Sequence, residues 1–265
     1  MTATNRLCGA GAGSTALAAA AMLVLAWPTL AHSASAPTPS LSLRGLFGAT
    51  PDDRAFQAPP IARFRAGDGG TFVLDRTTPN QVLMKFEDNV EVWVLDPHPG
   101  PRGDVNYRND MGELVLRATR VGGLTLFTSD SPDGAPAALE GVAPVIRLPP
   151  VPTPTALLHD FAAASARASR AAQRLVTFEA EDVPLTATAL FADAAKVTSE
   201  AFVQIAEDGE DGRRSISRYS KVEFGAGSAP DAAARGAVVR ITIAPERGLA
   251  GRPSSHRIAA AIGRR

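Results

Sequence analysis

Few residues of this sequence have the types and spacing that catalysis or metal binding requires. Beyond residue 32 the histidines are His98, His159 and His256, and none has a second histidine or a cysteine at the spacing of metal ligands. Neither the Gly-x-Ser-x-Gly turn of serine hydrolases nor the Gly-x-x-x-x-Gly-Lys loop that holds phosphates occurs. The sequence therefore predicts no catalytic residue, no metal site and no cofactor.

An acidic run at 207–212, with the sequence EDGEDG, has the composition of a calcium-binding loop. When Gly212 is aligned with the glycine of such a loop, Gly209 stands where a ligand belongs and Arg218 stands where the bidentate glutamate belongs. Because the ligand pattern fails at both positions, we interpret the run as a solvated turn.

The most polar and aromatic rim of the expected meander lies between residues 96 and 110. It begins with DPHPGPRGD, a rigid proline loop that contains His98 and the tripeptide Arg-Gly-Asp, and polar and aromatic residues follow. Binding sites are common on loops that a rigid sheet supports. We predict that a ligand or partner binds here, through His98, Arg102, Asp104, Tyr107, Arg108 and Asp110. The alternative for His98 is an ordinary solvent-exposed loop histidine.

A second group of charges, Arg167, Arg170 and Arg174, is spaced to form a basic stripe along one side of a helix. An anion or a partner could dock on this stripe. The simpler interpretation is a solvated helix face, because arginines near a helix C-terminus also interact favourably with the helix dipole.

Residues 61–148 have the pattern of an antiparallel β-meander. Short runs rich in Val, Leu, Phe and Thr recur about every ten residues, separated by Gly, Asn and Asp turn signals. The expected strands are IARFR, TFVLDR, VLMKFE, EVWVLD, VNYR, LVLRAT and LTLFT. Two hairpins within 105–128 are the best defined, because Asn109 to Gly112 and Gly122-Gly123 supply glycines for positive-φ turn positions. Trp93 is expected to anchor the core.

The hydrophobic period changes after a proline-rich linker at 149–154. Apolar residues at spacings of three and four then predict amphipathic helices. The expected elements are a helix at about 155–175, a strand at 176–180, a helix at 190–205, strands at 215–224 and 237–244, and a weak helix from about Ser254. An antiparallel β-meander followed by an α-β-α-β-β segment over 155–265 predicts an α+β fold rather than alternating β/α units.

The first 31 residues have the three parts of a secretory signal peptide. Arg6 supplies a positive charge, residues 16–30 form an uncharged apolar run, and small residues suited to cleavage follow near Ala31. The apolar run is shorter than the ~20 residues of a spanning helix, so we expect cleavage and no stable membrane span afterwards. An uncleaved leader that tethers the protein to the membrane is the alternative. Residues 32–60 are predicted to be a flexible tether rich in Ala, Ser, Thr and Pro.

Composition narrows the choice of partners and compartment. The chain has 265 residues, of which 45% are hydrophobic, 27 are basic and 27 are acidic. It therefore lacks the basic excess expected of a protein that binds nucleic acid or an anionic membrane surface. Its one cysteine, Cys8, lies inside the predicted signal peptide, so the exported chain would have no disulfide and no thiolate site. We expect export, to the periplasm or envelope.

Three segments resemble a family of exported bacterial proteins known as domain of unknown function 4908. They are GPRGDVNYRNDMGELVLRATRVGGLTLFT at 100–128, ASARASRAAQRLVTFEAE at 164–181 and RGLAGRPSSHRI at 247–258. The resemblance extends from about Leu43 to Ile258. It implies an envelope protein with a signal peptide, and it implies no particular activity.

Two hypotheses for the function follow from these observations. The first is a non-enzymatic periplasmic or envelope-associated protein that binds an envelope protein or ligand through the loops of its β-meander. The alternative is a cell-envelope hydrolase whose carboxylates are brought together only by the fold, as in glycosidases.

Overall fold

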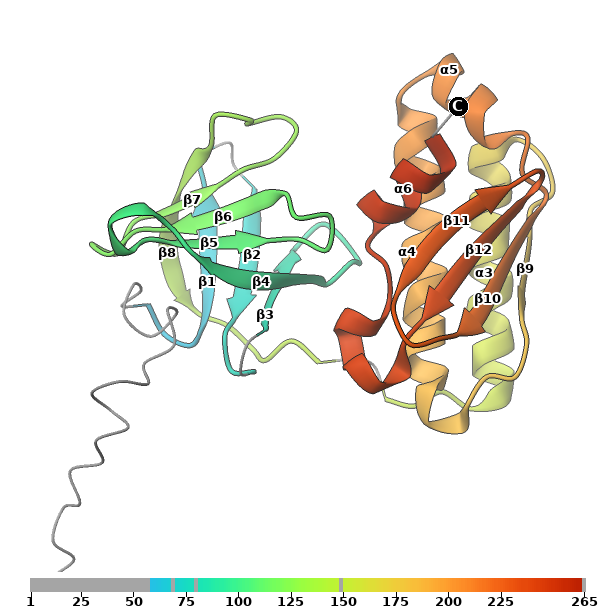
Figure 1. Cartoon of the computed structure of the whole chain (residues 1–265), viewed down its shortest axis with the longest axis horizontal. Helices are drawn as coiled ribbons and strands as arrows, with labels where there is room; N and C mark the ends of the chain where they lie inside the picture. Colours follow the sequence, from blue (N-terminus) through green and yellow to red (C-terminus); the bar gives the residue numbers. More distant parts are fainter. Residues whose placement is uncertain (1–57, 68–69, 79–80, 148–149, 264–265) are drawn as a thin grey trace, which may run out of the picture. The chain divides into compact units, whose positions relative to one another are not determined.

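The structure of this chain is a computed structural model that describes residues 58–67, 70–78, 81–147 and 150–263. The predicted signal peptide at 1–31, and the predicted tether up to residue 57, lie outside the described residues. All described residues belong to one compact unit. They contain a β-barrel and a second sheet that packs against helices, so the predicted α+β class is confirmed (Figure 1).

Eight consecutive antiparallel strands form the closed barrel. They are β1 (Ile61–Ala66), β2 (Thr71–Asp75), β3 (Val82–Phe86), β4 (Trp93–Pro99), β5 (Val105–Arg108), β6 (Leu114–Ala118), β7 (Leu124–Leu126) and β8 (Ala135–Val142). Each strand pairs with the next, and β8 pairs with β1. Buried Phe64 and Phe72 stack inside with ring centroids 5.6 Å apart. Side chains such as these fill the interior, as is usual for a barrel of this strand number.

The closure of the barrel was not predicted, because the eighth strand was missed. β8 has the sequence APAALEGV, and its mostly exposed side chains show no apolar alternation. The two hairpins predicted within 105–128 are confirmed, since β6 pairs with both β5 and β7. Gly112 and Gly122 have φ angles of 80° and 93° in the turns, which favour glycine.

The proline stretch predicted as a rigid loop, from Asp96 to Pro99, is instead the end of β4. The pairing of β3 with β4 stops at Val82 and Leu95, and beyond Leu95 the partner of β4 among the described residues is β5. Prolines are tolerated in a strand segment that lacks a neighbour on one side. Among the described residues, β4 therefore extends beyond its pairing with β3.

The rest of the described chain contains a four-stranded sheet and four α-helices. The elements are α3 (Pro154–Ala172), β9 (Thr177–Ala180), α4 (Thr188–Glu207), α5 (Glu210–Ile216), β10 (Lys221–Ala226), β11 (Asp231–Arg235), β12 (Val238–Ile243) and α6 (Ser255–Gly263). Short 3₁₀ segments are η1 (Pro101–Gly103), η2 (Leu185–Ala187) and η3 (Pro245–Gly251). The strand order is β11-β12-β10-β9, in which β10 is parallel to both neighbours and β11 is antiparallel to β12.

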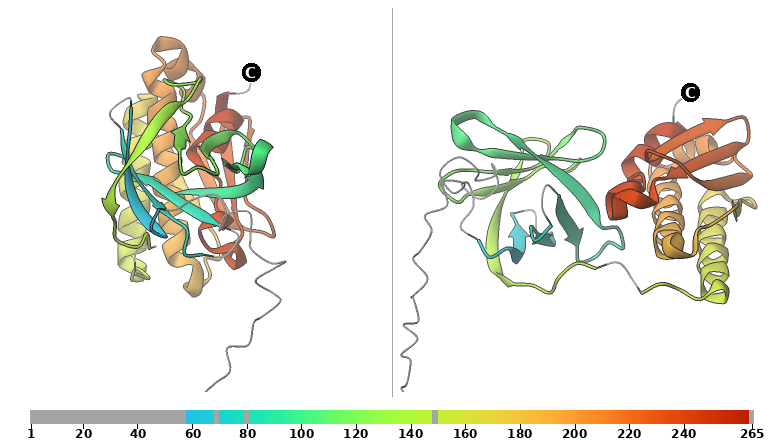
Figure 2. Two further views of the ribbon diagram at one scale, coloured as in Figure 1. Left: turned by 90° about the vertical axis from the view of Figure 1, so that its left-hand side faces the viewer. Right: turned by 60° about the horizontal axis from the view of Figure 1, so that its bottom comes forward.

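Helices α3 and α4 cover one face of this sheet (Figures 1 and 2). The face predicted for the second helix, from Leu190 to Ile205, is buried as expected. The first helix ends three residues earlier than predicted, at Ala172, and Leu158 and Leu175 are exposed rather than part of its apolar face. Because α4 packs against α3, α5 and α6, most of its residues are buried.

Two further features of the second sheet differ from the prediction. Helix α5 occupies the second half of the predicted turn at 207–212 and the start of the predicted strand at 215–224. Its acidic first turn and basic last turn interact favourably with the helix dipole. This order of charges in the sequence is typical of a short helix. Strand β9, helix α4 and parallel strand β10 also form a β-α-β unit, which the prediction of an α+β order without such units did not include.

Candidate functional site

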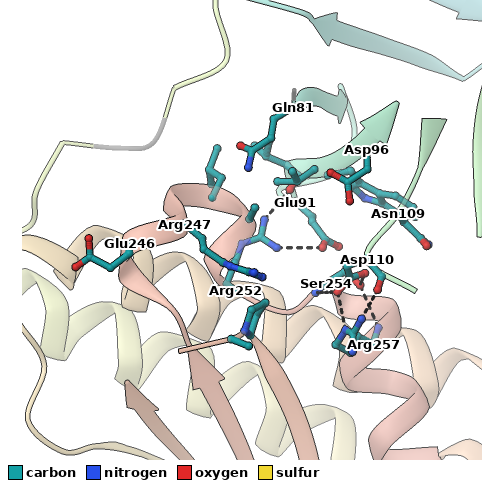
Figure 3. A pocket seen from close by; sticks show the side chains of 17 residues that line it. Gln81, Glu91, Asp96, Asn109, Asp110, Glu246, Arg247, Arg252, Ser254 and Arg257 are labelled. Carbon is teal, nitrogen blue, oxygen red and sulfur yellow. Dashed lines mark hydrogen bonds and ion pairs between the residues drawn. The ribbon is translucent and has the colours of Figure 1, made fainter. Parts of the chain in front are cut away.

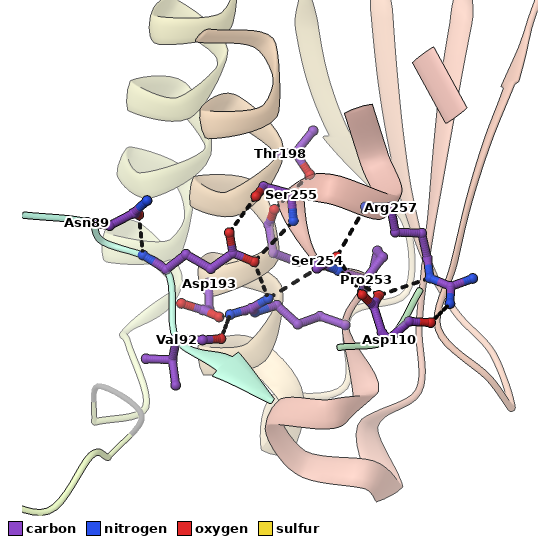
Figure 4. Close-up of polar contacts among 12 residues, drawn as sticks. Asn89, Val92, Asp110, Asp193, Thr198, Pro253, Ser254, Ser255 and Arg257 are labelled. Carbon is purple, nitrogen blue, oxygen red and sulfur yellow. Dashed lines mark hydrogen bonds and ion pairs between the residues drawn. The ribbon is translucent and has the colours of Figure 1, made fainter. Parts of the chain in front are cut away.

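The N-terminus of α6 is held by two carboxylates from the barrel loops (Figure 4). Asp110, in the β5–β6 turn, accepts hydrogen bonds from the Ser254 backbone N (3.1 Å) and Oγ (2.6 Å). Glu91, just before β4, accepts from the Ser255 backbone N (3.0 Å) and Oγ (2.5 Å). Helix N-termini have unpaired N–H groups and favour negative charge, so both carboxylates are well placed.

Asp110 also contacts the next turn of α6. Its Oδ2 accepts a hydrogen bond of 2.9 Å from Arg257 Nε, and its backbone carbonyl accepts one from the same guanidinium. The turn that carries Asp110 is fixed by buried Asn109, whose Oδ1 accepts from the backbone N of Met111 (3.0 Å) and of Glu113 (2.9 Å). The side chain of Asp110 is therefore presented from a well-defined turn.

An aromatic contact completes the junction between α6 and the barrel. The rings of Trp93 and His256 meet edge to face, with centroids 4.8 Å apart. His256 Nδ1 also lies 3.6 Å from Glu113 Oε2. Every residue from Ser254 to Arg257 thus contacts a residue of the barrel loops.

Arg252 lies beneath this junction and joins three segments of the chain. The residue is 5% exposed. Its guanidinium donates a hydrogen bond of 2.7 Å to the Val92 carbonyl and one of 3.4 Å to Glu91 Oε1. Its Nε donates to Asp193 on α4. Glu91 is fully buried, so this guanidinium compensates a charge that water cannot reach. The loss of one partner from such a buried pair typically costs ~3–5 kcal/mol.

The segment η3 directly precedes Arg252 and positions it in this network. The loop closes through a 2.7 Å hydrogen bond from the Ala244 backbone N to the Gly251 carbonyl. A Cβ at Gly251 would lie 2.0 Å from the Ala244 carbonyl oxygen, so only glycine permits this close approach. The chain therefore turns back on itself after β12 and enters the interior at Arg252.

A polar cleft of about 670 Å³ lies above this network (Figure 3). The barrel contributes Gln81, residues 91–94, Asp96 and the turn residues Asn109 and Asp110. The other wall consists of the β10–β11 turn at Ala229-Pro230 and side chains from η3 to Arg257. The volume falls within the range of small-molecule sites, ~300–1,000 Å³.

The charges around the cleft divide into those that are paired and those that face solvent. Arg252 and Arg257 are engaged with Glu91, Asp193 and Asp110. Asp96, Glu246 and Arg247 line the cleft and are exposed. None of the three forms an ion pair within the part of the chain that the structure describes. Glu246 points away from the other labelled side chains, so the cleft combines a fixed, internally neutralised floor with two charged groups, Asp96 and Arg247, that are available to a ligand (Figure 3).

The residues predicted as a site lie at the two ends of β5. His98, Arg102 and Asp104 surround the β4–β5 connection, where His98 and Arg102 are exposed and Asp104 Oδ1 accepts from the Arg120 backbone N at 3.4 Å. None of these three lines the cleft.

The other predicted residues belong to the opposite end of the strand. Asp110 lines the cleft, and Arg108 donates a 2.5 Å hydrogen bond to the Gly112 carbonyl in the same turn. Tyr107 is fully buried in the barrel core and is not on a binding rim. Trp93, expected in the core, is only partly buried there and lines the cleft. The structure thus brings Asp110, but not the other predicted residues, into the cleft.

Sequence reasoning missed Glu91, Asp193, Arg252 and Ser255, which hold the cleft together. A glutamate at the start of an apolar run, EVWVLD, is a weak sign of a buried carboxylate. The serines at 254 and 255 are a typical helix start. Neither sign identifies the partner, because the contacts join residues about 160 positions apart.

The open face of the second sheet carries a separate row of charges. Lys221 Nζ lies 2.8 Å from Glu179 and 3.1 Å from Glu223, and Arg240 donates 3.0 Å to Glu223. Hydrogen bonds to Glu179 and then Glu223 raise the pKa of Lys221. Hydrogen bonds from Arg240 and then Lys221 lower the pKa of Glu223. The row is exposed, so we interpret it as surface stabilisation.

Among the described residues, no group of three or more His, Cys, Asp or Glu side chains is arranged to hold a metal ion. Among the same residues, no helix is both long enough and apolar enough to cross a membrane.

Fold and site together define an α+β protein in which barrel loops and the start of a C-terminal helix enclose a polar cleft. The family model described as Domain of unknown function (DUF4908) matches residues 42–262, and the chain belongs to this family. Comparisons with curated proteins and with solved structures found no match. Two of the segments on which the resemblance rests, 100–128 and 247–258, supply Asp110 and the residues from Arg252 to Arg257 that meet at the cleft.

Proposed function

We propose that this protein is exported and binds a small polar ligand, without transforming it, in the cleft between the barrel loops and η3–α6. The observation that carries the proposal is the cleft itself, about 670 Å³ in volume, with two charged side chains available at its surface. The signal-like sequence at 1–31 supports export to the periplasm or envelope. As in the hypothesis drawn from the sequence, the proposed site includes loops of the β-meander. These loops are the ones at the end of the barrel that contains Asp110.

The buried network supports binding because it fixes the geometry of the cleft before a ligand arrives. Glu91, Arg252 and Asp193 hold the floor, and Asp110 holds the helix that forms one wall. A site whose walls are already in place loses less conformational entropy when it binds.

The hydrolase alternative has less support from this geometry. General acid–base catalysis on a glycoside requires two carboxylates that can reach the substrate. Glu91 and Asp110 both accept hydrogen bonds from the serines at the start of α6, and Glu91 is fully buried. Their oxygens stabilise the fold at this position. The exposed carboxylates that line the cleft are Asp96 and Glu246, and Glu246 points away from the other labelled side chains (Figure 3). Asp96 is therefore presented without a second carboxylate beside it, which favours binding as the role of the cleft.

The proposal is tested by purifying the full chain from the cells that produce it, unfolding it, and analysing the released small molecules by mass spectrometry. The variant Ala229→Trp places a large ring at an exposed turn position that lines the cleft. We expect a near-stoichiometric small molecule from the native protein and none from this variant.

Val121→Trp is the matched control, because Val121 is 91% exposed in a turn that does not line the cleft. This variant should retain the ligand. The proposal is wrong if the native protein releases no such molecule, or if Ala229→Trp retains it as well as Val121→Trp does.

A further inference from the structure

The two available charges of the cleft have opposite signs and come from opposite walls (Figure 3). Asp96 belongs to β4, at the point where β3 stops pairing with it, and Arg247 belongs to η3. Glu246, the remaining charged lining residue, points away from the other labelled side chains. A ligand in the cleft therefore meets one carboxylate and one guanidinium whose charges no protein partner among the described residues neutralises.

Both charged residues are held by rigid surroundings. The Arg247 backbone N donates 3.0 Å to the Ala244 carbonyl within the closed η3 loop, and buried Arg252 anchors the end of that loop. The backbone of Asp96 is paired with the backbone of Arg108, where strands β4 and β5 are hydrogen-bonded. The backbone positions that carry the two charges are therefore fixed, and both side chains line the same cleft, where one ligand can contact both.

We infer that the ligand is a zwitterion, a free amino acid or a short peptide with unblocked ends. This inference rests on the proposed binding function. The guanidinium of Arg247 suits a carboxylate, with which it can form two parallel hydrogen bonds. The carboxylate of Asp96 suits an ammonium group. Trp93, Val92 and Leu249 also line the cleft and offer apolar surface to side chains of the ligand.

The test uses the protein as it is produced. Of its two tryptophans, Trp27 lies in the predicted signal peptide, and Trp27→Phe is added for preparations that keep the leader. In either preparation Trp93, in the cleft lining, is the only tryptophan and reports on binding by its fluorescence. The probes are alanine, trialanine, N-acetyl-trialanine, trialanine amide and the doubly blocked peptide. We expect saturable binding of trialanine or alanine. Acetylation of the amino end or amidation of the carboxyl end should each weaken the binding of trialanine by roughly tenfold, because each removes one charge that forms hydrogen bonds with the protein.

Two variants assign the charges to residues. Arg247→Ala should weaken the binding of trialanine by roughly tenfold and leave the binding of trialanine amide unchanged, since the amide already lacks the anion. Asp96→Asn should weaken the binding of trialanine by roughly tenfold and leave the binding of N-acetyl-trialanine unchanged, since the acetylated peptide already lacks the ammonium group. Arg120→Ala removes an exposed arginine outside the cleft and should bind every probe like the parent protein.

The inference is overturned if the doubly blocked peptide binds as tightly as trialanine, or if Arg247→Ala and Asp96→Asn both retain full affinity. A lack of response to alanine and trialanine at millimolar concentration overturns it as well. In each of these cases the proposed function still stands if the native protein releases a small molecule that Ala229→Trp does not. The two proposals therefore fail separately.

Discussion

Arg252 is the residue on which the geometry of the cleft depends most directly. It is the cation between Glu91 and Asp193, and it also donates to the Val92 carbonyl. Its side chain is 2% exposed and that of Asp193 is 11% exposed, so solvent screens these charges poorly. A buried pair of this kind is weak evidence for added stability, but the removal of one member is strongly destabilising.

We therefore expect Arg252→Ala to lower the free energy of unfolding by about 3–5 kcal/mol, because Glu91 and Asp193 lose their cation. Urea denaturation followed by circular dichroism measures this change. Arg247→Ala is the matched control in the preceding loop, and as an exposed residue it should change stability by less than about 0.5 kcal/mol. Equal effects of the two substitutions would contradict the role assigned to Arg252.

At the scale of secondary structure, elements with a strong local pattern were predicted, and strands without one were missed. The hairpins around Gly112 and Gly122 were predictable because turn chemistry is local. Helix α4 was predictable because its apolar period is strong. Strand β8 was missed because a mostly exposed strand with a proline lacks that period, and β11 because DAAAR has few β-forming residues.

The cleft was predictable only in part for the same reason. Asp110 stands in a polar turn, which is a local signal. Glu91 and Arg252 belong to the site because they contact each other across about 160 positions of sequence, and no pattern within either segment predicts that contact.

The charged row on the open face of the second sheet leads to a pH prediction. The pKa of Glu223 is lowered from its ordinary 4.5, so its ionised form stabilises the fold above pH 4.5, and this contribution is lost as pH falls through the lowered pKa. Lys221 has a raised pKa, so its contribution is complete below pH 10.5 and is lost as pH rises through the raised pKa.

Glu223→Gln should therefore be less stable than the parent protein at pH 7 and equally stable in acid below the lowered pKa, as measured by thermal melts across pH. High salt should reduce the difference at pH 7, because the pairs are exposed. Glu181→Gln, at an exposed neighbouring position without an ion pair among the described residues, is the control. A difference that persists unchanged in acid would show that packing, and not charge, explains the effect.

At the scale of the whole chain, the barrel and the second sheet are connected through the residues around α6. Contacts from Glu91 and Asp110 reach residues 144 to 164 positions later in the sequence. The cleft therefore exists only when the C-terminal segment is present and folded against the barrel loops. Removal of α6 would expose the carboxylates of Glu91 and Asp110 and remove one wall of the site.

Export is the remaining prediction at this scale, and it concerns residues outside the described structure. A fusion of residues 1–40 to alkaline phosphatase should be active, because this reporter forms its essential disulfides only after export. Leu23→Arg in the apolar run should abolish activity, whereas Thr4→Arg in the region before it should not, because a positive charge is compatible with that region. Intact mass of the exported full chain should place its first residue close to His32. A reporter that remains inactive would contradict export, and a mass that begins at Met1 would show that the leader remains as a membrane tether.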